Sequence, residues 1–368
     1  MNVPLLDLKA QYDQILPKIR TEIDKVLESH RYILGPQVKE FEEDMQKYCE
    51  AKHAVGCASG TDALVLALKA LQIQEDDEVI TTTFTFFATA GAISRVGAKP
   101  IFVDIKPDTF NIDPKQIENA ITPKTKAIIV VHLFGQPAEM DTIMEIAQKN
   151  KLKVIEDNAQ GIGAKFNGKV AGSIGDIGTL SFFPSKNLGA MGDAGMCLTN
   201  NDELAARLIQ LRVHGENPQY FHKWVGLNSR LDTIQASVLK VKLPYLESWS
   251  DARRKNAQYY FSKLNDVSQI KTPFIHEKAT SIYNQFTLLA EDRDELLKYL
   301  RNKNIGCAVY YPKPLHIQEC FSKLGYKKGD LPIAEEISQK VISIPIYSEI
   351  TKEQQDYVIE NIKEYYSN

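Results

Sequence analysis

The sequence predicts an α/β fold: a mostly parallel sheet flanked by helices in a large domain, then a smaller C-terminal α+β domain. Three observations support this prediction. Strand-like and helix-like segments alternate between residues 54 and 156, which is the pattern of βαβ units. The strand-like segments are almost continuously apolar, as in a sheet buried on both faces. From about residue 250 onward, shorter strands and helices are mixed.

In the first half of the chain, apolar periodicity distinguishes strands from helices. Ser59 or Thr61 is expected to cap the first of the helices between the strands, and Asp113 a later one. The predicted strands cover residues 54–58, 78–82, 99–105, 125–133 and 152–156. The predicted helices cover residues 62–71, 88–96, 114–121 and 140–149.

The second half begins with a glycine-rich stretch, residues 161–178. We then expect strands at 179–183 and 196–199 around a loop at 184–195, a helix at 202–213, an exposed loop at 215–228 and a helix at 231–246. The charged stretch 247–255 either continues that helix or links two domains. Further strands are expected at 283–289 and 307–311, and helices at 293–302 and 352–364. We place the large domain, including an N-terminal helix, at 1–248 and the smaller domain at 249–368.

Composition excludes several classes of protein. The chain has 368 residues, of which 43% are hydrophobic and 25% charged, as in soluble globular proteins. Its net charge of -3 argues against broad binding to nucleic acid or to a membrane surface.

No apolar run approaches the roughly 18–20 residues that span a bilayer, and residues 1–10 lack the layout of a signal peptide. Five scattered cysteines without a CxxC, and histidines without an HExxH, indicate no disulfide framework and no metal site. We expect a cytoplasmic protein.

Two reactive side chains stand near the ends of predicted strands. Asp157 directly follows a buried strand, where α/β sheets bind ligands. It could pair with a protonated ring nitrogen, or simply cap the next turn. Lys186 lies between Phe182-Phe183 and a run of small residues that would draw its loop inward. Burial would lower the pKa of its amine for Schiff-base chemistry, whereas an ordinary surface lysine would stay solvated.

Two further features concern a phosphate and a flat ring. The turn at residues 59–63, Ser-Gly-Thr-Asp-Ala, joins a strand to a helix. It could bind a phosphate at the helix N-terminus or serve only as a cap. The stretch 83–87, Thr-Phe-Thr-Phe-Phe, follows another strand, and an aromatic residue there could stack on a ring or pack in the core. Together the four features describe a pocket for pyridoxal 5'-phosphate (PLP), which requires a lysine, a carboxylate, a phosphate site and a stacking surface.

The chain resembles the DegT/DnrJ/EryC1/StrS family of PLP-dependent nucleotide-sugar aminotransferases, a branch of the aspartate aminotransferase fold (fold type I). The resemblance runs nearly end to end. Its motifs are short singly but specific as an ordered set, and they lie at residues 4–8, 59–64, 97–104, 154–160, 181–189, 192–195, 228–232 and 311–316.

The resemblance implies a role for each matching residue. Lys186 matches the Schiff-base lysine, and Asp157 the acid on the pyridine nitrogen. The other implied cofactor contacts are Gln160 to the ring hydroxyl, Phe86 (or Phe84) as the stacking ring, Gly60, Thr61 and Ser181 to the phosphate, and Asn228 to the phosphate of a neighbouring subunit. Arg230, Tyr310 and Tyr311 would face the substrate. A homodimer with shared active sites is therefore implied.

The implied activity is transfer of an amino group from L-glutamate to a nucleotide-linked keto-sugar in amino-sugar biosynthesis. Tyr310-Tyr311 stands where relatives that use uronic acids carry His-Tyr, which favours a deoxy-keto-sugar, and the expected position is carbon 3. Lys186 argues against the family's dehydratases, which carry histidine there. A PLP lyase and a PLP-binding regulator are alternatives on the same fold. A dinucleotide oxidoreductase would need a GxGxxG after the first strand, which is absent.

Overall fold

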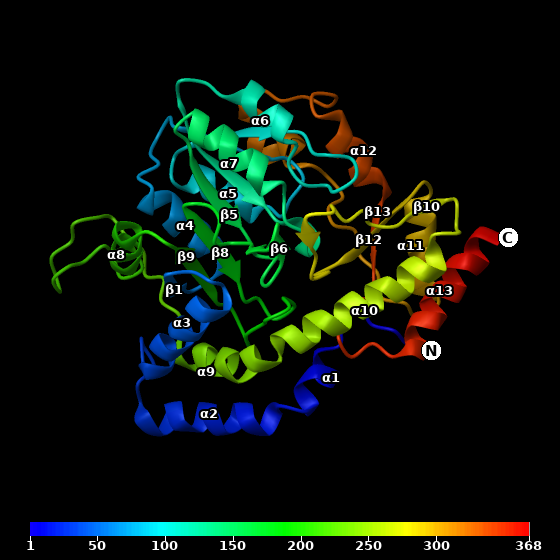
Figure 1. Ribbon diagram of the computed structural model, residues 1–368, viewed down its shortest axis with the longest axis horizontal. Coiled ribbons are helices and arrows are strands. Elements are labelled where there is room, and N and C mark those ends of the chain that lie inside the picture. The colour runs from blue at the N-terminus through cyan, green and yellow to red at the C-terminus, as the bar shows by residue number, and fades with distance from the viewer. Residues whose placement is uncertain (368) are drawn as a thin grey trace.

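The computed structural model describes residues 1–367. A large sheet lies at one end of the molecule and a smaller sheet at the other, with a long helix running between them (Figure 1). The large sheet contains seven strands in the spatial order β1 (His53–Cys57), β9 (Gly195–Thr199), β8 (Ile177–Ser181), β5 (Lys153–Asp157), β4 (Thr125–Val131), β2 (Glu78–Thr82) and β3 (Lys99–Val103). From β8 to β3 the strands are parallel, whereas β9 is antiparallel to both of its neighbours. The predicted α/β class with a mostly parallel sheet is confirmed.

Helices cover both faces of this sheet: α4 (Gly60–Ala70), α5 (Ala88–Arg95) and α8 (Asp202–Leu211) on one face, α6 (Pro114–Ala120) and α7 (Met140–Lys149) on the other. Successive side chains of a strand point to opposite faces. In β4, Ala127 and Ile129 accordingly pack in the first cluster, and Ile128 and Val130 in the second. Burial on both faces explains the continuous apolar runs in the sequence.

Three N-terminal helices, α1 (Leu8–Asp13), α2 (Leu16–Ser29) and α3 (Pro36–Tyr48), lie near α9 (Thr233–Lys242). Helix α2 lies beside α9 (Figure 1), and Ile15, Ile19 and Val238 form a core cluster there. From α9 the chain continues into the long helix α10 (Leu246–Leu264), which leads to the C-terminal part (Figure 1). The charged stretch 247–255 is therefore helical, but it belongs to α10 and does not continue α9 without a break.

The C-terminal part is built on an antiparallel sheet of β10 (Ile270–Lys271), β12 (Phe286–Ala290) and β13 (Val341–Ile344), with helices α11 (Arg293–Asn302), α12 (Pro332–Lys340) and α13 (Lys352–Ser367). Its core also includes Val3 from the N-terminus. A third small sheet joins β11 (Ala279–Thr280) to β6 (Lys165–Phe166) and β7 (Lys169–Val170). The division at 248/249 stays a prediction, and it falls within α10. Among residues 1–367, no helix is long and apolar enough to cross a membrane.

Several predicted elements differ from the structure for identifiable reasons. The predicted helix 231–246 is interrupted after α9 by a 3-10 turn, Leu243–Tyr245, which contains Pro244; proline cannot donate to the preceding helical turn. The predicted strand 283–289 begins only at Phe286, since Tyr283 has a positive φ of 44°. The loop between α8 and α9 extends away from the body of the molecule, as predicted for an exposed loop (Figure 1).

The predicted strand 307–311 is wrong. Only Ala308 forms an isolated bridge, with Ser343 of β13. Successive strand side chains would point to opposite faces, but Tyr310 and Tyr311 both line the same cavity. The segment therefore leaves the sheet, and it continues into the 3-10 turns Leu315–Ile317 and Glu319–Leu324.

Candidate active site

A cavity of about 600 Å³ lies at the carboxyl ends of the parallel strands. Val131, Asp157 and Ser181 are the last residues of β4, β5 and β8 and all line it. This edge is where open α/β sheets bind ligands. Of the residues that the sequence singles out, the cavity is lined by Gly60, Thr61, Phe86, Asp157, Gln160, Ser181, Lys186, Tyr310 and Tyr311.

Lys186 lines the cavity from the loop between β8 and β9, which we call the lysine loop (residues 182–190). Its backbone N–H donates to the carbonyl of Phe183 at 2.8 Å, which closes a tight turn. Burial lowers the pKa of the Lys186 amine to about 8, although the negative charge of Asp157 raises it. At neutral pH more of this amine is therefore unprotonated than in a solvated lysine, as a nucleophile requires.

Asp157 lines the same cavity as Lys186, from the end of β5. Its Oδ2 accepts a hydrogen bond from the hydroxyl of Thr89 at 2.7 Å, and its Oδ1 accepts one from the backbone N–H of Ala159 at 3.3 Å. Burial raises the pKa of Asp157, outweighing these two hydrogen bonds and the charge of Lys186. The carboxylate thus carries charge that its neighbours do not fully compensate, and a cationic N–H in the cavity would do so.

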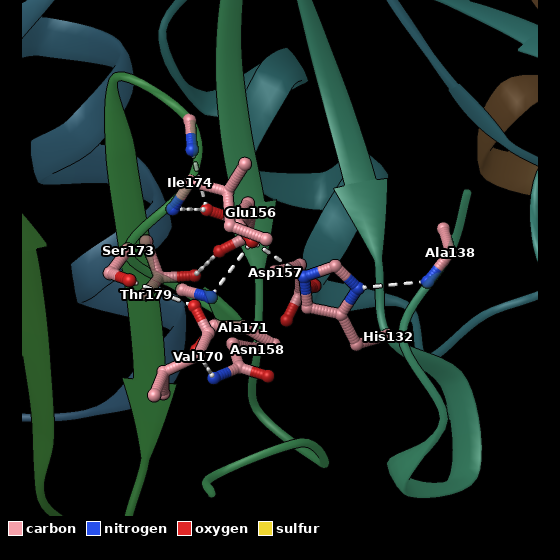
Figure 2. Close-up of polar contacts among 12 residues, drawn as sticks. His132, Ala138, Glu156, Asp157, Asn158, Val170, Ala171, Ser173, Ile174 and Thr179 are labelled. Carbon is pink, nitrogen blue, oxygen red and sulfur yellow. Dashed lines mark hydrogen bonds and ion pairs between the residues drawn. The ribbon is translucent and has the colours of Figure 1, made fainter. Parts of the chain in front are cut away.

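Glu156, one residue earlier, points to the other face of the sheet and is fully buried. Figure 2 shows its carboxylate between His132 and the backbone that follows β7. His132 Nε2 lies 2.9 Å from Glu156 Oε2, and the N–H groups of Gly172, Ile174 and Gly175 donate to the same carboxylate. Burial raises the pKa of Glu156, but these partners bring it below its usual value. The network holds the end of β5 and so the position of Asp157.

The turn into α4 forms another side of the cavity. Ser59 is the N-cap, since its hydroxyl accepts the N–H of Asp62 at 3.1 Å. The first N–H groups of a helix lack partners within the helix, and they favour an anion. A Cβ added to Gly60 would lie 2.6 Å from the Cβ of Ser181. The hydroxyl residues Thr61 and Ser181 therefore line the cavity beside this helix N-terminus.

The two candidate stacking residues have different environments. Phe86 lines the cavity and is 59% exposed. Phe84 is fully buried, with its ring centroid 6.5 Å from that of Phe110. Of the two candidates, Phe86 lines the cavity and Phe84 does not.

Gln160 and the two tyrosines form a polar wall. The N–H of Phe134 donates to Gln160 Oε1 at 2.7 Å, and Gln160 Nε2 donates to the hydroxyl of Tyr311 at 3.0 Å. Burial raises the pKa of Tyr311, which keeps this hydroxyl protonated. Tyr310 lines the cavity beside it.

Asn228 and Arg230 do not line this cavity. Asn228 is exposed at the end of the loop between α8 and α9, and Arg230 is partly exposed. On the same loop, Tyr220 and Phe221 are 80% and 69% exposed.

Other residues of the site were not predicted. Thr89 contacts Asp157, and Thr85, Asp193 and Gln285 line the cavity. Thr89 lies in the first turn of α5, the helix that follows β2. A hydroxyl residue at the start of such a helix is only a weak sequence signal for a contact with Asp157. Gln285 comes from the C-terminal part, and no local pattern marks it.

The cavity fits PLP. The N-terminus of α4 suits the phosphate, and the carboxylate of Asp157 suits a protonated pyridine nitrogen. Phe86 offers a flat ring, and Lys186 an amine of lowered pKa. The fold and this donor set together define a PLP-dependent enzyme of fold type I.

Comparison with known proteins identifies the family. A model of the DegT/DnrJ/EryC1/StrS aminotransferase family matches residues 13–363. The chain belongs to this family, which confirms the resemblance seen in its motifs. It is 52% identical over 368 residues to a protein of Geobacillus stearothermophilus named "Pleiotropic regulatory protein", covering 100% of this chain and 99% of that one.

Two further comparisons concern named aminotransferases. The chain is 45% identical over 352 residues to the UDP-N-acetyl-3-dehydro-alpha-D-glucosamine 3-aminotransferase of Acidithiobacillus ferrooxidans, covering 96% of this chain and 95% of that one. It superimposes on the crystal structure of S. venezuelae DesV in complex with a ketimine intermediate, with a TM-score of 0.97, 40% identity and coverage of 100% and 99%. These relatives confirm the predicted enzyme class.

Proposed function

We propose that the enzyme uses PLP to transfer the amino group of L-glutamate to the ketone of a nucleotide-linked keto-sugar, at carbon 3 of a 6-deoxy hexose. The products are 2-oxoglutarate and the amino-sugar nucleotide, so nitrogen and oxygen are exchanged between the two substrates. One observation carries the use of PLP: Lys186 and Asp157 line one cavity, where the amine has a lowered and the acid a raised pKa. The keto-sugar substrate is supported by the similarity to named nucleotide-sugar aminotransferases.

The chain's own residues have distinct tasks in this reaction. PLP, when bound, supplies an electron sink for the carbon that bears the amino group. Lys186 would hold the cofactor through its Nζ, and the same amine would move a proton to and from the reacting carbon. Asp157 would hold a proton on the ring nitrogen. Gly60, Thr61 and Ser181 would bind the phosphate, Phe86 would stack on the ring and Gln160 would contact its hydroxyl.

Substrate contacts are proposed for Tyr310 and Tyr311, which line the cavity. Asn228 and Arg230 lie outside the cavity of their own chain, and this supports a role in the site of a second copy. We therefore propose a homodimer with shared active sites. We also propose a cytoplasmic location, which agrees with five free cysteines.

The experiment is a screen of nucleotide-linked keto-sugars with ¹⁵N-labelled L-glutamate. We expect one equivalent of 2-oxoglutarate per site without a sugar, and ¹⁵N in the sugar product by mass and NMR with the right one. Release of labelled ammonia instead would favour a PLP lyase. If glutamate yields no 2-oxoglutarate under any condition, glutamate is not the donor.

A regulatory function is the second candidate, because the relative that is 52% identical carries a regulatory name. A regulator would bind PLP but turn over no amino donor. The same screen separates the two functions, since steady turnover of a keto-sugar contradicts a purely regulatory role.

A further inference from the structure

A buried lysine lies behind the lysine loop. Lys242, at the end of α9, is fully buried. Its Nζ donates to the carbonyl of Gly189 at 2.6 Å and lies 3.3 Å from the hydroxyl of Tyr12. The same Nζ lies 4.6 Å from the centre of the Tyr12 ring and 5.8 Å from that of Trp249. The ammonium therefore sits among a carbonyl, a hydroxyl and two aromatic faces.

This arrangement is unfavourable for an ammonium group. Burying a charge without a paired carboxylate is costly, because the contacts with dipoles and rings replace only part of its hydration. Burial lowers the pKa of Lys242 to about 8, although the charge of Glu349 raises it. An apolar side chain of similar length would fill the space without this penalty. The hydrogen bond to the carbonyl of Gly189 therefore accounts for an amine at this buried position.

Gly189 is in direct contact with the turn that carries Lys186. A Cβ added to Gly189 would lie 2.3 Å from the carbonyl oxygen of Pro184 and 3.0 Å from that of Phe183. The Phe183 carbonyl in turn accepts the backbone N–H of Lys186. A shift of Gly189 is therefore transmitted directly to the backbone of Lys186.

The lysine loop has other anchors on either side of Gly189, including a hydrogen bond that the Tyr12 hydroxyl donates to the carbonyl of Ala190 at 3.5 Å. The N–H of Ala190 donates to the carbonyl of Phe182 at 2.7 Å, which closes the loop at its base. On the other side of Lys186, the Asn187 side chain accepts from Asn284 Nδ2 at 2.8 Å and donates to the carbonyl of Ile282 at 3.2 Å. Lys242 supplies the side-chain anchor for the segment between Asn187 and Ala190.

We propose that Lys242 is a positioning residue for Lys186: its ammonium holds the Gly189 carbonyl, and through Tyr12 it joins helix α1 to the lysine loop. The inference rests on the proposed role of Lys186, but the loop geometry can be tested independently of turnover. Helix α1 becomes a support for the active site, even though it lies outside the large sheet.

The test compares Lys242→Met with a matched control, Lys240→Met. Lys240 lies on the same helix, partly exposed, and pairs with Glu40. Hydrogen exchange is followed by mass spectrometry in the full-length enzyme, with and without PLP. Lys242→Met should speed exchange about tenfold in peptides covering 183–190 and α1, while α13 keeps wild-type protection. The control should match wild type throughout.

Kinetics provide a second readout. If Lys186 is displaced by even a fraction of an ångström, kcat should fall about tenfold or more while KM for L-glutamate stays within about twofold. Tyr12→Phe removes one contact of the amine and also the hydrogen bond that the Tyr12 hydroxyl donates to the carbonyl of Ala190 at 3.5 Å. If Lys242→Met does not fold, wild-type loop exchange in Tyr12→Phe would show that neither contact positions the loop.

Three results would overturn the proposal: wild-type exchange of 183–190 in Lys242→Met, faster exchange spread evenly over the whole chain, or wild-type loop exchange in Tyr12→Phe when Lys242→Met cannot be made. Absence of transamination in the wild-type enzyme would refute the proposed function instead, and the exchange comparison would still decide the anchoring role.

Discussion

Burial shifts the pKa values of Lys186 and Asp157 in opposite directions. It lowers the pKa of the amine and raises that of the carboxyl, so each charged form is disfavoured. Each group is the main nearby counter-charge of the other, yet their attraction does not restore ordinary values. Such a pair suits a ligand that attaches covalently to Lys186 and donates a ring N–H to Asp157.

The first prediction concerns the amine. In the protein without PLP, acylation of Lys186 by a neutral reagent should rise with pH and reach half its maximum near pH 8, because only the unprotonated amine reacts. Peptide mass spectrometry can follow the reaction at Lys186 in the native protein and in the urea-unfolded chain. The same pH profile in both states would contradict a pKa that is lowered by burial.

The second prediction concerns the acid. Because burial raises the pKa of Asp157, the native protein without PLP binds this proton more tightly than the unfolded chain does. Its stability contribution is present at low pH and is lost as pH rises past the usual aspartate range. Asp157→Asn should therefore raise the melting temperature relative to wild type more at pH 7 than at pH 4.

The same substitution should reduce turnover by about 10²-fold to 10³-fold, since it removes the charge that stabilises the protonated ring. The stability and activity effects thus have opposite signs. If Asp157→Asn lowers both the melting temperature and turnover, the variant has a folding defect. If it keeps wild-type turnover, the role assigned to Asp157 is contradicted.

At the scale of elements, the active site depends on where strands end and helices begin. Gly60 starts α4 against the last residue of β8. Gly60→Ala should force these elements apart, because its Cβ would lie 2.6 Å from that of Ser181. We expect the Kd for PLP to rise about tenfold, as the phosphate loses aligned N–H donors. Titration of cofactor absorbance checks this, and an unchanged Kd would show that the helix N-terminus does not bind the phosphate.

Sequence patterns predicted those elements whose periodicity extends over several turns or a full buried strand. Helices 140–149 and 293–302 match α7 and α11 because their apolar residues recur on one face. Short elements were missed: β13 follows α12 without a turn residue between them. Residues 307–311 are rich in residues that favour strands. Tyr310 and Tyr311 nevertheless line the same cavity, which the alternating side chains of a strand would not allow.

The site was predictable where a motif coincides with a strand end, as at Asp157, Ser181 and the turn before α4. It was not predictable where tertiary structure alone supplies the contact. Thr89, Gln285 and Lys242 are far apart in the sequence. Packing of the chain brings Thr89 to Asp157, Gln285 to the cavity and Lys242 to the back of the lysine loop.

At the scale of the whole molecule, Asn228 tests the proposed sharing of sites. Neither Lys186→Ala nor Asn228→Ala alone should support normal turnover. In a mixed dimer, however, one site combines Lys186 with a partner's intact Asn228. Mixing the two variants after dissociation should therefore restore activity to about a quarter of wild type, since half the dimers are mixed and each has one intact site. Activity no greater than that of the separate variants would contradict shared sites.

The most direct test of the account is borohydride reduction of the PLP-loaded enzyme, followed by peptide mapping. Borohydride reduces a carbon–nitrogen double bond and so links the cofactor permanently to the amine that holds it. We predict one phosphopyridoxyl group per chain, on Lys186, and none in Lys186→Ala. A label on another lysine, or no label on a PLP-loaded protein, would contradict the central claim.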